Sequence, residues 1–416
     1  MPTRRLLGVA VASAAIGLVA AGPACALTQA EIDRVATHAT RGVVRVVRTL
    51  ANNELRGRDN DTPESLVAQR YLIGSLKERG PGLNRTAVGD DAYTQPFDES
   101  GQRGTNLLAV IPGRELPNEY VIVGAHYDHL DSRSDAGGHC TSNGPPGGAV
   151  CNGATDNAAG VAAVLAIGKG LRALSEAPRR SVVLALWDAE EDGLLGSRHY
   201  VQQPLVPLAQ TVAYVNFDIL GAVLVPTLRA TTFAVGSETG GSALRGAVDA
   251  AAAAQSLNVR PFSYIFGQLR SDYANFVAAG VPTVFFSDST GGCYHTTGDD
   301  VRVVDFRKLA QQTAIAFRTV VALSEAPARP SFVAPNPALA VFEDAVSLQQ
   351  VLATAVPADL GLFGPDQQAL VTSTKAQIDQ IVNAGPAQFD GGDVTTVLNA
   401  AVALIDALTG MGCRAF

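Results

Sequence analysis

Short runs of apolar residues alternate along most of the chain with longer stretches in which apolar residues recur at helical spacing. The runs are rich in Val, Ile and Phe and have strand length, which predicts buried β-strands at residues 106–111, 120–124, 181–187, 211–217, 231–235 and 283–286. The longer stretches predict helices at residues 29–50, 64–79, 157–174, 194–201, 242–255, 272–279 and 305–322. This alternation predicts an α/β fold with a mixed, centrally parallel β-sheet flanked by helices on both faces.

The pattern changes near the C-terminus. Four prolines fall between Pro327 and Pro337, and beyond them Ala, Val and Leu recur at helical spacing to the end of the chain. We therefore expect a main domain over residues 27–326, followed over residues 327–416 by a Pro-rich linker and a helical C-terminal extension. The alternative for this extension is a separate binding module.

The first 26 residues have the pattern of a signal peptide. Arg4 and Arg5 precede an uncharged apolar run, and Ala24-Cys25-Ala26 offers the small residues that a signal peptidase accepts. The alternative is a membrane anchor, but the run is short for the roughly 20 residues that span a bilayer. We expect cleavage, a secreted or periplasmic protein and no stable membrane anchor.

Composition and charge narrow the class of protein further. Hydrophobic residues make up 47% of the chain and charged residues 17%, which is typical of a globular protein. Loss of the two leader arginines takes the formal charge from −8 to about −10. A nucleic-acid partner is disfavoured, because the chain has no basic run to neutralise phosphates. We expect a monomer.

Four cysteines remain after removal of the leader. An even number in an exported chain predicts two disulfides, for which three connectivities exist. A bond between Cys140 and Cys151 closes a short loop and is our first choice, which leaves Cys293 to pair with Cys413.

Residues suited to metal binding follow several of the expected strands. His126 comes directly after the strand at residues 120–124, and Asp128 suits a role in which its carboxylate orients the imidazole of a metal ligand. The alternative is an ordinary surface loop, and we assign His129 and His139 to that class.

Asp156 lies in a Gly- and Ala-rich segment just before an apolar helix. It could cap the helix, the usual reason for Asp at such a boundary. The small residues around it also leave space for metal ions to approach, which favours a bridging ligand.

Glu190 and Glu191 follow the strand at residues 181–187, between Asp188 and Asp192. Adjacent carboxylates repel one another, so a cation is the natural compensation, and the alternative is a solvated acidic turn. One glutamate can bind metal while its neighbour acts as a general base. Other expected strand ends supply Asp218 and His295, which completes the ligands for two Zn²⁺ around a shared carboxylate.

With these residues in order, the chain resembles the bimetallic, co-catalytic zinc aminopeptidases, the family of aminopeptidase S, aminopeptidase Y and the glutamate carboxypeptidase relatives. The likeness runs from about residue 54 to residue 323 and includes the motif at residues 54–58. It implies that His126 and Asp218 hold one zinc, that Glu191 and His295 hold the other, and that Asp156 bridges them.

The same resemblance gives roles to the remaining site residues. Glu190 would be the general base, with Asp128 as the orienting carboxylate. Tyr294 would donate a hydrogen bond to the oxyanion, and Arg270 would contact substrate.

The expected function is hydrolysis of the N-terminal peptide bond of peptides with a free N-terminus, through a hydroxide held by two zinc ions per chain. Carboxypeptidase or dipeptidase action, a glutaminyl cyclase and a non-catalytic, receptor-like relative remain as alternatives. The sequence does not determine the preferred N-terminal residue.

Overall fold

The computed structural model describes residues 27–99, 101–130, 140, 150–336 and 339–416. The expected signal peptide therefore lies outside the described residues. The strands are β1 (Thr94–Glu99), β2 (Gln102–Ile111), β3 (Leu116–His126), β4 (Arg180–Trp187), β5 (Thr211–Phe217), β6 (Thr231–Val235), β7 (Asn258–Phe262) and β8 (Thr283–Ser287). The helices are α1 (Gln29–Ala39), α2 (Val43–Leu50), α3 (Pro63–Lys77), α4 (Ala159–Ala173), α5 (Leu195–Gln202), α6 (Gly241–Ala253), α7 (Tyr273–Ala278), α8 (Phe306–Glu325), α9 (Phe342–Asp359), α10 (Pro365–Ala384) and α11 (Gly391–Thr409).

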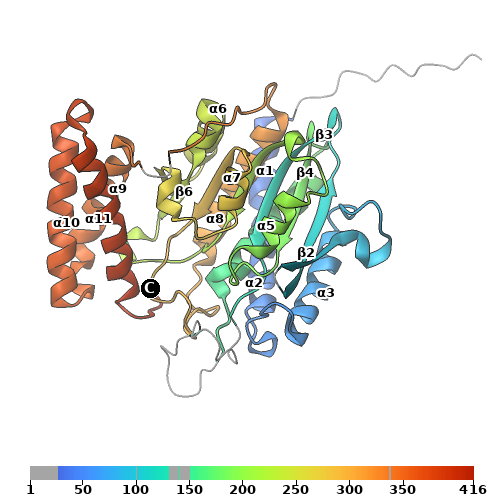
Figure 1. The fold of residues 1–416 in the computed structure, drawn as a ribbon, viewed down its shortest axis with the longest axis horizontal. Coiled ribbons are helices and arrows are strands. Elements are labelled where there is room, and N and C mark those ends of the chain that lie inside the picture. The colour runs from blue at the N-terminus through green and yellow to red at the C-terminus, as the bar shows by residue number, and fades with distance from the viewer. Residues whose placement is uncertain (1–26, 100, 131–139, 141–149, 337–338) are drawn as a thin grey trace, which may run out of the picture.

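The described strands form one mixed sheet in the order β1-β2-β4-β3-β5-β8-β6-β7 (Figure 1). Its centre is parallel, because β3 pairs in parallel with β4 and β5, and β5 pairs in parallel with β8. The pairs β1–β2, β2–β4 and β6–β8 are antiparallel. The expected mixed, centrally parallel sheet is thus confirmed.

Burial on both faces explains why the central strands read as continuous apolar runs. Along β3, Val121 and Val123 face a core shared with α1, α2, α4 and α8. Ile122 faces the opposite core, where Tyr200 of α5 and Phe276 of α7 pack. Helices therefore cover both faces of the sheet, as expected.

Two strands, β1 and β7, were missed by the hydrophobic pattern. They are the two edges of the sheet, and their segments, TQPFDE and NVRPF, are only partly buried. Each contains a proline, which edge strands tolerate because one side of the backbone lacks a partner strand. Polar edge strands do not show the apolar run by which buried strands are found.

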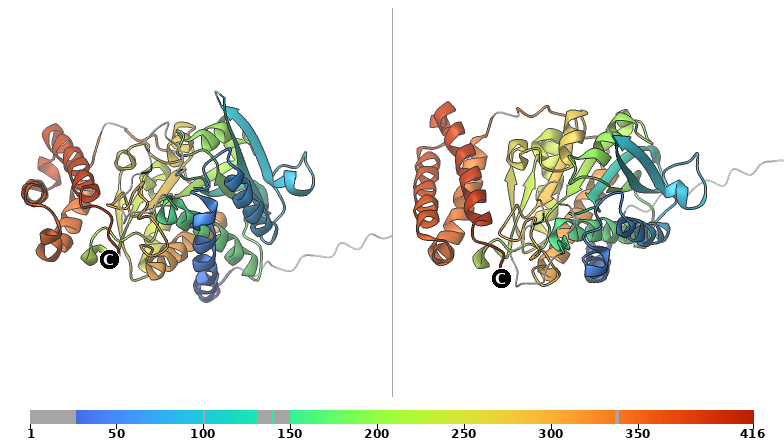
Figure 2. Two further views of the ribbon diagram at one scale, coloured as in Figure 1. Left: turned by 90° about the horizontal axis from the view of Figure 1, so that it is seen from below. Right: turned by 60° about the horizontal axis from the view of Figure 1, so that its bottom comes forward.

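The last three helices form a bundle at one end of the sheet, beside the edge made by β6 and β7 (Figures 1 and 2). The expected helical character of this region is confirmed. Within the described residues, α11 is the one helix long and apolar enough to cross a membrane by length and composition, a test that core helices also pass.

Two aspartates of α9 hold the bundle against the rest of the fold. Asp344 accepts hydrogen bonds from the Ser263 amide at 2.7 Å and the Ser263 hydroxyl at 2.8 Å, just after β7. At the other end of α9, Asp359 accepts from the Thr227 amide at 2.9 Å. The first helix of the bundle is therefore fixed at both ends.

A glycine in the middle of β3 allows a close packing that gives a stability prediction. A Cβ at Gly124 would lie 2.6 Å from Trp187 Nε1 and 2.8 Å from the Tyr214 hydroxyl, two groups that hydrogen-bond each other. We expect Gly124→Val to lower the free energy of unfolding by about 1–3 kcal/mol through overpacking, measured by denaturant unfolding. The control is Gly246→Ala in α6, where a Cβ meets no atom within 4 Å; equal destabilisation by both changes would contradict this account.

Candidate metal centre

The candidate ligands converge at the carboxyl ends of the parallel strands. His126 is the last residue of β3, while Glu190 and Glu191 follow β4 and Asp218 follows β5. His295 lies in the loop after β8. In α/β sheets these strand ends share one edge, where ligand sites form.

Asp156 lies between the two imidazoles. Its Oδ1 is 3.2 Å from His126 Nε2, and its Oδ2 is 3.3 Å from His295 Nε2. The side chain that caps this end of α4 is that of Asn157, whose Oδ1 accepts a hydrogen bond from the Gly160 amide at 3.0 Å, so the alternative of a capping aspartate is wrong. A buried carboxylate with one oxygen toward each histidine has the geometry of a bridging ligand.

The outer ligands complete two groups around this aspartate. Asp218 Oδ1 lies 3.4 Å from His126 Nε2, and Glu191 Oε2 lies 3.0 Å from His295 Nε2. In the group of His126, Asp156 and Asp218, all ligand atoms lie within 4.8 Å of one another. The same holds for the group of His129, Asp156 and Glu191, so Asp156 belongs to both.

The residues present fit a pair of divalent ions such as zinc. Imidazole nitrogens and carboxylate oxygens are ligands that zinc accepts. Asp156 Oδ2 and Asp128 Oδ1 are buried and have no hydrogen-bond partner among the residues that the structure describes. Such oxygens are costly to bury, and a cation removes the cost.

Asp128 connects the two halves of the site. Its Oδ1 lies 3.5 Å from His126 Nδ1, and its Oδ2 accepts a hydrogen bond from the Glu191 amide at 3.1 Å. It is thus placed to orient the imidazole on one side and the backbone of the glutamate on the other.

His129 was assigned to a surface loop by sequence reasoning, and this was wrong. The residue is fully buried, and its Nδ1 lies 2.7 Å from Glu191 Oε1. Its position, three residues after His126, was the available signal, but an isolated His carries too little pattern to be selected. His139 lies outside the described residues.

Sequence reasoning also missed Asp299, which holds the segment that carries Asp156. Asp299 accepts hydrogen bonds from the Thr155 amide at 2.9 Å, the Thr155 hydroxyl at 2.8 Å and the Asp156 amide at 3.0 Å. Burial raises the pKa of Asp299 to about 6, against the opposing effect of these bonds. It joins the loop of His295 to the segment of Asp156.

Arg58 lies in the motif quoted for the family resemblance, and it binds backbone rather than acids. It is fully buried and donates to the carbonyl oxygens of Tyr127 at 2.7 Å, Asn152 at 2.6 Å and Gly153 at 2.8 Å. Burial lowers the pKa of Arg58 to about 10, although nearby acids oppose the shift. One side chain therefore fixes the two segments that carry His126 and Asp156.

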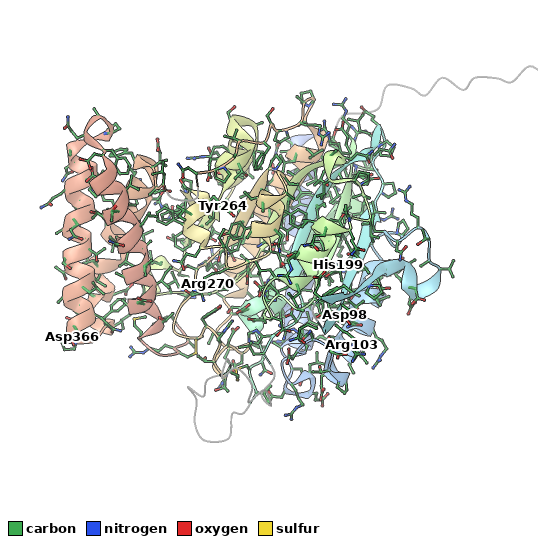
Figure 3. The ribbon with its side chains drawn as sticks, viewed as in Figure 1. Asp98, Arg103, His199, Tyr264, Arg270 and Asp366 are labelled. Atoms are coloured by element: carbon green, nitrogen blue, oxygen red, sulfur yellow. A yellow bond between two sulfur atoms is a disulfide. The ribbon has the colours of Figure 1, made fainter. Side chains whose placement is uncertain are left out.

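Tyr294 and Arg270 meet at the rim of the site. The Arg270 Nη2 donates to the Tyr294 hydroxyl at 3.1 Å, and Figure 3 places Arg270 on the side of the sheet toward the C-terminal helices. Burial, together with the acids Asp156 and Glu191, raises the pKa of Tyr294. The phenol stays protonated and keeps its own proton available for a bond to a ligand.

The acidic surroundings shift the ionisation of the candidate base and ligands. Burial, reinforced by Asp218 and Glu191, raises the pKa of Glu190 well above its usual range. Burial also raises the pKa of Asp218. Burial opposes ionisation of Glu191 as well, but contacts with His129 and His295 lower its pKa to about 2. Bound cations would hold all three carboxyl groups ionised.

The structure contains two disulfides, in the pairing that the sequence favoured. One joins Cys140 to Cys151, and the other joins Cys293 to Cys413. The second links the loop of Tyr294 and His295 to the segment after α11. Two disulfides are compatible with an extracellular protein.

Comparison with known proteins gives a family match over slightly more than half of the chain. The model described as peptidase family M28 matches residues 106–320. The chain is 32% identical over 137 residues to leupeptin-inactivating enzyme 1 of Streptomyces exfoliatus, covering 33% of this chain and 27% of that protein. It is also 32% identical over 235 residues to the probable glutamate carboxypeptidase LAMP1 of Arabidopsis thaliana, covering 53% and 30%. The matched region therefore spans less than a third of either relative.

Solved structures share the fold at low identity. The LapA aminopeptidase of Legionella pneumophila is 15% identical, with a TM-score of 0.56 over 74% of this chain and 79% of that one. The aminopeptidase of Aneurinibacillus sp. strain AM-1 is 14% identical, with a TM-score of 0.52 over 73% and 98%. The glutaminyl cyclase of Porphyromonas gingivalis is 17% identical, with a TM-score of 0.54 over 68% and 97%.

The two histidines give a prediction for metal binding. Burial alone would lower their pKa values, but the surrounding acids raise the pKa of His295 to about 10 and that of His126 well above its usual value. Both rings are therefore protonated at pH 7 without metal. In the metal-free protein these ion pairs stabilise the fold fully at pH values below about 6.5, the pKa of histidine in the unfolded chain. This stabilisation is lost as the pH rises through the higher pKa values that the two histidines have in the folded protein.

Zinc binds neutral imidazole, so we expect at least two protons to be released on binding at pH 7, one from each ring, and affinity to fall as pH falls. Calorimetry in two buffers of different ionisation enthalpy measures this number. The His295→Gln variant should release about one proton fewer. Binding heats that are independent of the buffer would contradict the prediction.

Proposed function

The chain belongs to peptidase family M28, and from that membership we propose that it is a secreted, zinc-dependent aminopeptidase that works with two Zn²⁺. The observation that carries the proposal is the convergence of His126, Asp156, Glu191, Asp218 and His295 on one centre with Glu190 beside it. In this proposal residues 27–326 are the peptidase domain and residues 327–416 its extension.

Zinc bound at this centre would polarise the substrate carbonyl and acidify a water molecule. Glu190 takes the proton of the attacking water and returns it to the leaving amine. Asp128 keeps the His126 ring in position, and Asp156 keeps the two halves of the centre together. The Tyr294 hydroxyl donates to the oxyanion that develops on the substrate.

The choice of the amino end rests on the carboxylates of the cavity. Asp156, Glu190, Glu191 and Asp218 all line the cavity that opens onto the centre. With two Zn²⁺ bound these four carboxylates are balanced in charge, but carboxylate oxygens that face the cavity can accept hydrogen bonds from the α-ammonium group of a peptide, which a terminal carboxylate cannot donate. We therefore propose peptides with a free N-terminus as the substrates. We also propose that the enzyme is a monomer without a membrane anchor and that the signal sequence at residues 1–26 directs its export.

One observation favours a second candidate, a carboxypeptidase. Arg270 lines the same cavity and is exposed, and its guanidinium could bind a terminal carboxylate bidentately. A relative named as a probable glutamate carboxypeptidase is consistent with this reading. The glutaminyl cyclase fold neighbour and a receptor-like relative are weaker candidates, because the chain carries the ligands for both metals and a candidate base.

The general-base role predicts a specific loss of activity. We expect Glu190→Ala to keep both zinc ions and lower kcat on leucyl anilide by about 10²–10⁴-fold, because no other side chain would take the proton. The control is Asp192→Ala, which removes the same charge at an exposed position. Zinc content by atomic absorption and kcat by anilide release are the measurements, and near-normal turnover by Glu190→Ala would refute the role.

The terminus attacked is a separate prediction. We expect a free peptide to shorten from its amino end, and an N-acetylated copy to remain intact, when both are followed by mass spectrometry. A zinc chelator should abolish the reaction and added zinc should restore it. Shortening of the acetylated peptide from its carboxyl end would select the carboxypeptidase instead.

A further inference from the structure

The cavity at the metal centre extends far beyond the candidate ligands. It runs from Asp156 and His295 to Leu404 and Leu408 of α11. Because the candidate ligands and α11 line the same cavity, a substrate held at the metal centre lies in one continuous space with the C-terminal helices.

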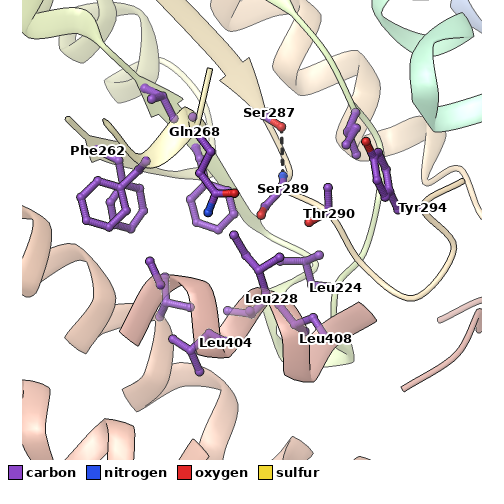
Figure 4. A pocket seen from close by; sticks show the side chains of 18 of the residues that line it. Leu224, Leu228, Phe262, Gln268, Ser287, Ser289, Thr290, Tyr294, Leu404 and Leu408 are labelled. Atoms are coloured by element: carbon purple, nitrogen blue, oxygen red, sulfur yellow. Dashed lines mark hydrogen bonds between the residues drawn. The ribbon is translucent and has the colours of Figure 1, made fainter. Parts of the chain in front are cut away.

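The part of the cavity away from the metal centre is lined mainly by apolar side chains, and Gln268 is a polar exception beside Phe262 (Figure 4). Leu224 and Leu228 lie close to Leu408 of α11, and Leu404 lies farther along the same helix (Figure 4). At the other end the lining includes Tyr294 and the candidate ligands. The cavity therefore suits a molecule with a polar, hydrolysable end and a long apolar remainder.

The C-terminal helices are held firmly enough to act as a wall. Asp344 and Asp359 fix both ends of α9, and the Cys293–Cys413 disulfide ties the end of α11 to the loop of His295. A Cβ at Gly292 would lie only 2.1 Å from the Gly412 carbonyl oxygen, so the two backbones touch there. These contacts connect the far wall to the elements that carry the metal centre.

We propose that the C-terminal helices determine specificity, and that the substrates carry an extended apolar chain next to the scissile bond, longer than the side chain of leucine. This inference rests on the proposed aminopeptidase function and adds the substrate class to it. The chain would lie between β6–β7 and α11, while the α-amine and the carbonyl stay at the metal centre. Apolar area removed from water supplies the preference.

A series of anilides of α-amino acids with aliphatic side chains of increasing length tests the proposal on the zinc-loaded full chain. The series runs from alanyl through leucyl to 2-aminooctanoyl and 2-aminododecanoyl, all with a free amine. We expect kcat/KM to rise beyond leucyl by about fourfold for each added methylene, until the cavity is filled.

The wall is tested by two changes on one helix. We expect Leu404→Glu to lower kcat/KM for the 2-aminooctanoyl substrate at least tenfold and to leave the alanyl substrate within twofold, because only long chains reach this wall. The matched control is Val402→Glu, on the same helix at a position 50% exposed, which should leave both substrates unchanged.

A second variant without an added charge keeps the test decisive if Leu404→Glu prevents folding. Ala401 also lines the cavity, and Ala401→Phe narrows it without adding charge. We expect the preferred chain length to shift toward shorter side chains, by two or more methylenes. An unchanged optimum would overturn the role of α11.

The two proposals fail in different ways. Hydrolysis of alanyl and leucyl anilides with a steady decline beyond leucyl would overturn the extended-chain inference and leave the aminopeptidase intact. Absence of hydrolysis for every free-amine anilide, with zinc bound, would overturn the aminopeptidase proposal itself.

Discussion

Uncompensated negative charge at the carboxyl ends of the central strands is the constraint on which the site depends. Asp128, Asp156, Glu190 and Asp218 are buried, and Glu191 lies among them with its oxygens against two imidazoles. Carboxylates packed this closely repel one another in a medium that screens poorly. The protein surrounds them with buried donors and imidazoles, and bound cations would complete the balance. The rigid sheet keeps the repelling groups together.

Much of the fold followed from the sequence because its central strands are buried on both faces. Such strands must be apolar throughout, so the strands at residues 120–124 and 211–217 could be predicted without knowledge of the strands that they pair with. The edges β1 and β7 were not, because half of an edge strand faces solvent and its polar residues break the run. The leader, the domain division and the site roles remain predictions.

Site residues could be predicted from the sequence where several reactive side chains lie in one short motif, as at Glu190–Glu191. They could not be predicted where a residue acts through tertiary contacts alone. His129 reaches Glu191 across 62 positions of sequence, and Asp299 reaches Thr155 across 144. Arg58 binds carbonyl oxygens, which every residue has, so no side-chain pattern could reveal its partners. Such residues determine the geometry of the candidate site, but the sequence around them shows no pattern that identifies them.

The Cys293–Cys413 bond has a consequence for the fate of the protein in a protease-rich medium. The polypeptide leaves the α/β core at the proline-containing connector of residues 327–336, yet it is joined to the core again by this bond after α11. A single nick in the connector would therefore produce two fragments that stay covalently attached. The bundle would lose one covalent connection and keep the other, and after reduction of the disulfide only noncovalent contacts such as those of Asp344 and Asp359 would hold it.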